Sequence, residues 1–108
     1  MAEIYNKTII IGRLGNNPKC EHSEKGDIAC FCVSSNTFRD GEEIINWHDI
    51  KALGKQAKLC AEYLHEGDLC CIEGTLDTKA CKKDCETRYS QVIVAEHITF
   101  LSSRRTQV

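Results

Sequence analysis

The chain has 108 residues, with 14 lysine and arginine residues against 16 aspartate and glutamate residues and a formal net charge of −2. That length accommodates a single domain over residues 1–108, and the charge excludes a strong overall attraction to nucleic acid or to an anionic membrane. Any polyanion site must therefore be local. No segment approaches the roughly 20 apolar residues that span a bilayer, and residues 1–7 lack the features of a signal or transit peptide, so we expect a cytoplasmic protein.

Two strands are predicted in the first third of the chain. Residues 6–14 carry a run of three isoleucines, and residues 28–35 form a second strand that is apolar on both faces at its centre. The polar residues 19–27 between them contain a Lys-Gly-Asp turn signal and predict a loop. Residues 36–43 predict another loop, with its turn at an Arg-Asp-Gly sequence.

The only tryptophan lies on a third predicted strand, which leads into Gly54-Lys55. Side chains alternate along a strand, so one face carries Trp47, Asp49 and Lys51, and the opposite face, expected to point into the core, carries His48, Ile50 and Ala52. A flat apolar ring among polar neighbours on the wetter face is suited to stacking on a nucleic-acid base.

The rest of the chain predicts a helix and two further strands. Residues 55–64 have helical periodicity, with Gly67 where the chain must leave the helix. Residues 68–77 and 90–101 predict the fourth and fifth strands, joined by a polar connection. An all-β barrel of five strands with one short helix between strands 3 and 4 is the OB-fold arrangement, which we predict here.

A series of segments in chain order resembles the bacterial single-stranded DNA-binding protein family. No single segment is specific, but together they cover nearly the whole chain: residues 6–18, Trp47-His48, Gly54-Lys55, residues 61–64, Gly67, residues 73–76 and Arg88-Tyr89. The resemblance implies an OB-fold, a homotetramer of two dimers, and coating of single-stranded DNA during replication, recombination and repair.

The resemblance also implies candidate DNA-binding residues, which fit the need for aromatic platforms and for cations that track the phosphates. Trp47 matches the family's stacking tryptophan, and Phe38 falls near another aromatic position. The other readings are a core or interface role for Trp47 and a position folded onto the barrel for Phe38. The candidate cations are Lys7, Arg13, Lys51, Lys55, Lys79, Lys82, Lys83 and Arg88.

Several positions depart from the family pattern. Leu53 and residues 80–81 stand where the family usually has aromatic residues, and Asp49 and Glu66 occupy places that are often basic. We therefore expect weaker DNA binding than is usual in the family. The alternative function is an OB-fold module for protein assembly, of the primosome-accessory kind, with weak DNA binding.

The sequence carries no pattern typical of an enzyme. It has no nucleophile motif, no phosphate-binding glycine loop and no paired carboxylates, so we expect no catalysis and no cofactor. His48 has no partner at ligand spacing, and the resemblance places it at a subunit interface. Replication and repair proteins are further candidate partners, but residues 104–108 lack the linker and acidic tip through which the family recruits other proteins.

The eight cysteines are expected to be free thiols in a reducing compartment. Five lie in apolar periodic segments, where a thiol behaves as a small buried hydrophobe: Cys30, Cys32, Cys60, Cys70 and Cys71. Cys81 and Cys85 could ligate zinc together with Cys20 and His22, or could form a disulfide with each other. Neither is favoured, and we predict no metal site.

Overall fold

The computed structural model describes residues 5–83 and 86–101, without the side chains of Lys79 and of residues 81–83. Its elements are β1 (Thr8–Leu14), β2 (Lys19–Ser23), β3 (Gly26–Arg39), β4 (Glu42–Leu53), α1 (Lys55–Tyr63), β5 (Leu69–Lys83) and β6 (Glu86–Phe100). The strands form one sheet in the order β1-β5-β6-β4-β3-β2, and pairing between β1 and β3 closes five of them into a barrel. α1 follows the third of these five barrel strands, so the predicted OB-fold is confirmed.

The core of the barrel is built from small and branched apolar side chains. Ile50 and Ala52 on β4 are buried and His48 is half-buried, whereas Trp47 and Asp49 are exposed and Lys51 is half-buried. The predicted inward and outward faces of this strand are therefore confirmed. The other buried apolar residues are Ile10, Leu14, Ala29, Phe31, Val33, Ala57, Cys60, Leu64, Cys70, Ile72, Ile93 and Ala95.

The first expected loop is wrong in part, because residues 19–23 form the additional strand β2. This strand pairs with β3 from Lys19 opposite Cys30 to Ser23 opposite Gly26. It lies at the edge of the sheet and four of its five residues are exposed, so it shows no hydrophobic alternation in the sequence. The predicted turn after it is present, and Gly26 takes the positive φ of 119° that favours glycine.

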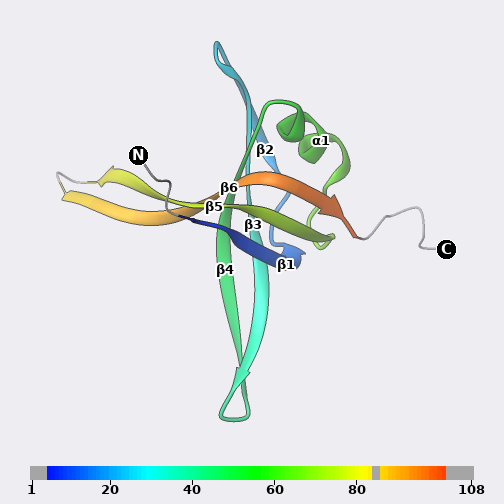
Figure 1. The fold of residues 1–108 in the computed structure, drawn as a ribbon, viewed down its shortest axis with the longest axis vertical. Coiled ribbons are helices and arrows are strands. Elements are labelled where there is room, and N and C mark those ends of the chain that lie inside the picture. The colour runs from blue at the N-terminus through cyan, green and yellow to red at the C-terminus, as the bar shows by residue number, and fades with distance from the viewer. Residues whose placement is uncertain (1–4, 84–85, 102–108) are drawn as a thin grey trace.

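Two long hairpin arms replace the other expected connections (Figure 1). The β3–β4 ladder continues to Arg39 opposite Glu42, and only Asp40 and Gly41 form the turn, both with positive φ. The β5–β6 ladder likewise runs through residues 78–83, which were expected to be an irregular connection. Because side chains along the outer arms are largely exposed on both faces, burial imposes no period-2 pattern there.

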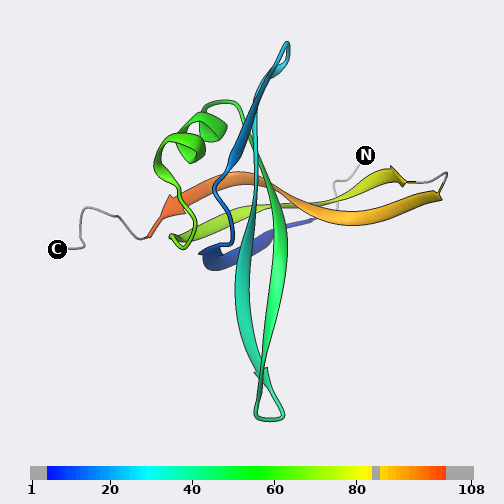
Figure 2. The same cartoon turned by 180° about the vertical axis from the view of Figure 1, so that it is seen from behind.

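The predicted helix ends one residue earlier than expected, at Tyr63, and lies beside β2 and β3 (Figure 2). It buries Ala57 and Cys60, whereas Ala61 is exposed. At nine residues it is too short to cross a membrane, and no other helix occurs in residues 5–83 and 86–101.

The prediction of buried thiols holds for Cys60 and Cys70 but is wrong for Cys30, which is exposed. The centre of β3 is apolar on both faces, so the sequence alone did not show which face points inward. In the structure Ala29 and Phe31 fill the core, and Cys30 faces outward between Lys19 and Lys51.

Candidate functional site

Trp47 stands in a row of three paired residues that crosses the outside of the barrel. Arg13 on β1 lies opposite Ser34 on β3, and Ser34 lies opposite Trp47 on β4. Residues paired across antiparallel strands share one face of the sheet, which we call the outer face. Trp47 is 61% exposed on this face, so the reading of it as a core residue is wrong.

Gly15 makes room for the Trp47 ring. A Cβ atom at Gly15 would lie 2.9 Å from Cη2 of Trp47 and closer still to Cζ3. The benzo edge of the indole therefore lies against the bare backbone of residue 15, and the backbone N–H of Gly15 donates to the carbonyl of Cys32 at 2.8 Å. This contact holds the exposed ring in a defined place on the barrel.

Phe38 lies on the same outer face, four residues beyond Ser34 along β3 and opposite Glu43 on β4. Its side chain is 71% exposed near the end of the β3–β4 arm. It is not folded onto the barrel, which overturns that alternative. The outer face therefore carries two exposed aromatic rings on one hairpin.

A basic row crosses the other end of this face. Lys19 on β2 lies opposite Cys30 on β3, and Cys30 lies opposite Lys51 on β4. Lys51 was a candidate, whereas Lys19 was interpreted as an ordinary solvated surface lysine. Only the pairing of β2 with β3 brings Lys19 into line with Lys51.

The remaining candidate cations are more scattered. The Arg13 guanidinium donates to the carbonyl of Gly67 at 3.0 Å, Lys55 is exposed at the start of α1, and Lys7 is exposed just before β1. Arg88 on the β5–β6 arm lies 3.9 Å from a carboxylate oxygen of Glu86. Lys79, Lys82 and Lys83 belong to β5, but their side chains lie outside the described part of the structure.

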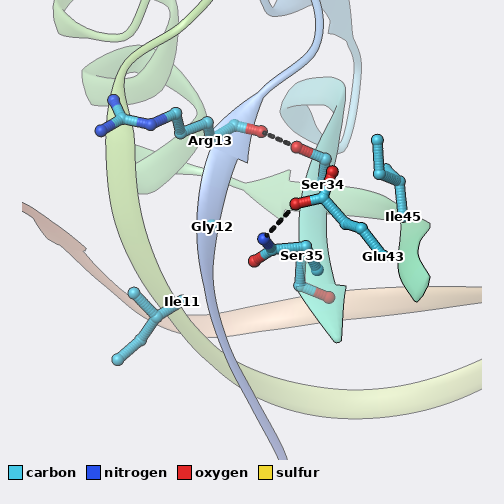
Figure 3. A pocket seen from close by; sticks show the side chains of 8 residues that line it. Ile11, Gly12, Arg13, Ser34, Ser35, Glu43 and Ile45 are labelled. Atoms are coloured by element: carbon cyan, nitrogen blue, oxygen red, sulfur yellow. Dashed lines mark hydrogen bonds between the residues drawn. The ribbon is translucent and has the colours of Figure 1, made fainter. Parts of the chain in front are cut away.

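A groove on the outer face separates β1 from the β3–β4 arm (Figure 3). It has a volume of about 270 Å³ and is lined by Ile11 and Arg13 of β1, Ser34 of β3, and Glu43 and Ile45 of β4, among others. The Arg13 side chain points away from the other labelled residues in this view. The groove therefore offers apolar and polar side chains, while the guanidinium lies outside it.

A second hollow, the fork pocket, lies where the two arms separate. It is lined by Trp47, His48, Asp49, Leu76, Gln91 and Ile93 and has a volume of about 150 Å³. Asp49 accepts a hydrogen bond from the Cys32 thiol at 3.3 Å. Burial and this carboxylate raise the pKa of Cys32, so the thiol keeps its proton and donates it to Asp49.

The comparisons with known proteins agree with the resemblance in the sequence. Residues 5–101 match the model of the single-strand binding protein family. A single-stranded DNA-binding protein of Xylella fastidiosa is 34% identical over 96% of this chain and 68% of its own length. Single-stranded DNA-binding protein 1 of Chlorobaculum tepidum is 32% identical over 96% of this chain and 69% of its own length. The chain belongs to the single-strand binding protein family.

A solved structure supports the fold of this family member. A chain of the Plasmodium falciparum SSB complex with ssDNA superposes with a TM-score of 0.87, covering 94% of this chain and 99% of that one. At 21% identity, this similarity concerns the fold. It agrees with the closed barrel and the single helix seen here.

Two further sequence-based predictions for this member of the single-strand binding protein family concern His48 and a metal site. His48 is half-buried and its Nε2 lies 2.9 Å from the Ser35 hydroxyl, so its interface role stays a prediction. Within the described residues, no three histidine, cysteine or carboxylate side chains are grouped to hold a metal. The side chain of Cys81 and the whole of Cys85 lie outside those residues.

Proposed function

We propose that this chain binds single-stranded DNA without requiring a particular sequence. The observation that carries the proposal is the outer face, on which the exposed rings of Trp47 and Phe38 share one surface with the exposed Arg13 and the half-buried Lys51. Stacking on aromatic rings tolerates any base, because every base has a π face, and cations bind the phosphates that all sequences share. Binding of this kind protects or presents exposed strands and involves no catalytic step.

Aromatic and basic residues have different roles in the proposed binding. Trp47 and Phe38 stack on bases, and phosphates run past Lys51 and Lys19 on the basic row. Further phosphate contacts come from the cations beside this path: Lys7, Arg13, Lys55, Lys79, Lys82, Lys83 and Arg88. Asp49 and Glu66 oppose phosphate binding, so the affinity falls below that of members with cations at these positions.

We also propose that the chain assembles as a homotetramer with His48 at a subunit interface. In support, Ile9 and Ile11 on the exposed side of β1 each leave 58% of their surface uncovered, and apolar surface of this kind is commonly buried between subunits.

Light scattering measures the molar mass directly. A tetramer mass for the wild type and a smaller mass for His48→Ala are the expected results, and a monomer mass for the wild type at micromolar concentration contradicts the proposal.

Trp47 provides its own test of DNA binding, since it is the only tryptophan. An oligothymidylate of several dozen nucleotides is titrated into the protein while the indole emission is recorded at several salt concentrations. We expect saturable quenching that weakens as salt rises, because stacking and phosphate contact occur together. No quenching and no change in anisotropy of a labelled oligonucleotide, even at low salt, would favour the protein-assembly module instead.

A further inference from the structure

We propose that Asp49 makes the fork pocket selective for bases that carry an amino group, such as cytosine, over bases that carry a carbonyl in its place, such as uracil and thymine. This inference rests on the proposed binding of single-stranded DNA. It assigns to Asp49 a role in base selection, where the sequence indicated only repulsion of phosphate.

The position of the pocket follows from the strand pairing. β4 and β6 are parallel neighbours at Ile50 opposite Ile93 and at Lys51 opposite Val94. Towards the start of each strand they separate into the β3–β4 and β5–β6 arms, which leave the barrel in different directions (Figures 1 and 2). The fork pocket lies at this separation, directly beside the exposed Trp47.

The lining of the pocket suits one flat heteroaromatic ring. Leu76 and Ile93 are paired across β5 and β6 and supply an apolar wall, and Trp47 borders the pocket from β4. His48, Asp49 and Gln91 supply polar groups. A nucleobase has apolar faces and a polar edge, so its faces match the wall and its edge matches these polar side chains.

Of the three polar side chains, only Asp49 is restricted to accepting hydrogen bonds. The Gln91 amide and the neutral His48 imidazole each carry a donor and an acceptor, so they can satisfy either an amino group or a carbonyl. A carboxylate only accepts hydrogen bonds, so it favours an amino donor and repels a carbonyl oxygen. Oδ1 of Asp49 already accepts from Cys32, and no ion pair joins Asp49 to a cation within the described residues. The carboxylate, on a side chain that lines the pocket, therefore keeps acceptor capacity that Cys32 does not use.

Cytosine and uracil probe this selectivity, because cytosine carries an amino donor at C4 where uracil carries a carbonyl. Uracil also has a donor at N3, but this N–H lies between two carbonyl oxygens, which a carboxylate repels. The experiment measures the dissociation constants of oligodeoxycytidylate and oligodeoxyuridylate of equal length for the wild type, Asp49→Asn and Glu43→Gln. Glu43→Gln is the matched control, since it removes one negative charge from the same strand and the same face, outside the fork pocket. Thermal unfolding establishes that each variant is folded.

We expect the preference for cytidylate over uridylate to fall by about fivefold or more in Asp49→Asn. An amide has both a donor and an acceptor, so it can hydrogen-bond to either base edge. Glu43→Gln should strengthen binding of both oligonucleotides equally and leave their ratio unchanged. If Asp49→Asn binds both oligonucleotides with the wild-type ratio, the selectivity is overturned while DNA binding stands. If the wild type binds neither oligonucleotide at low salt, the proposed function itself fails, and the selectivity fails with it.

Discussion

The indole of Trp47 lies against the backbone of Gly15, at a distance that leaves no room for a β-carbon on residue 15. The two residues are distant in the chain, since Gly15 directly follows β1 and Trp47 lies on β4. An exposed ring that rests on a neighbouring backbone loses less conformational freedom on binding than a freely rotating one. Gly15 therefore belongs to the candidate site although it offers no side chain.

The first prediction concerns this contact. Gly15→Ala should displace the Trp47 ring, shift its emission spectrum and weaken binding of oligothymidylate several-fold. The hydrogen bond from the Gly15 backbone to Cys32 does not require a bare α-carbon, so we expect the thermal unfolding midpoint to change little. Fluorescence and binding titrations on the folded variant measure both effects. A variant with wild-type emission and wild-type affinity would show that the contact does not position the ring.

Trp47→Ala should weaken binding of single-stranded DNA by about 1 to 3 kcal/mol per stacked base. Because 61% of the side chain is exposed, the fold should survive the substitution. Anisotropy of a labelled oligonucleotide measures the affinity without the tryptophan signal. Tyr63→Ala is the control, since it removes an exposed aromatic ring from α1, where Tyr63 packs near Phe100 away from the outer face. An equal loss in both variants would contradict a special role for Trp47.

Phe38→Ala tests whether the β3–β4 arm takes part in binding. We expect a loss of affinity that adds to the loss from Trp47→Ala, because the two residues are well separated along the hairpin and stack on different bases. The double variant is compared with the two single variants by the same anisotropy measurement. Full affinity in Phe38→Ala would remove the arm from the proposed DNA path.

Lys19 and Lys51 should each contribute one phosphate contact. The affinity is plotted as the logarithm of the binding constant against the logarithm of the salt concentration. Replacing either residue by glutamine should make the negative slope of this plot shallower by about 0.7, because one fewer phosphate contact releases counterions from the single strand. Lys58→Gln is the matched control, since Lys58 lies on α1 with its Nζ 3.8 Å from Asp27. If Lys19→Gln keeps the wild-type slope, the basic row does not contact phosphate.

Two buried thiols predict how stability depends on alkaline pH. Burial raises the pKa of Cys60 to about 12 and that of Cys70 to about 11, from the usual value of 9.0. The folded chain therefore holds these protons where the unfolded chain releases them, so the free energy of unfolding should fall as pH rises above about 9. Each thiol should contribute about 1 kcal/mol of this fall by pH 10.

Urea unfolding at pH 8 and pH 10 measures the effect of these thiols. The decrease between the two pH values should be smaller in Cys60→Ala than in Cys30→Ala, because Cys30 is exposed and serves as the control for loss of a thiol. Equal decreases in the two variants would mean that burial of Cys60 does not govern its ionisation.

The local pattern of apolar and polar residues was sufficient to predict the barrel and to predict which face of β4 points into it. Ile50 and Ala52 alternate with Trp47, Asp49 and Lys51. This alternation is visible in the sequence because only one face of β4 is buried. The helix was equally readable, because Ala57 and Cys60 recur with the period of one buried helical face. The alternation along β4 also supplied Trp47 and Lys51, and the resemblance to a family supplied Lys7, Arg13, Lys55 and Lys79.

Tertiary structure alone decided the features that depend on pairing between distant segments. β2 and the two arms carry little burial, so no periodicity marks them, and their ladders form through backbone hydrogen bonds to which nearly any residue contributes. Lys19 joins Lys51, Gly15 supports Trp47, and Asp49 meets Leu76 and Gln91 only because strands far apart in the chain become neighbours. The sequence by itself determined which face of β4 is buried, because Ile50 and Ala52 alternate there with Asp49 and Lys51, and the closure of the barrel determined the buried face of β3 and which exposed side chains lie together.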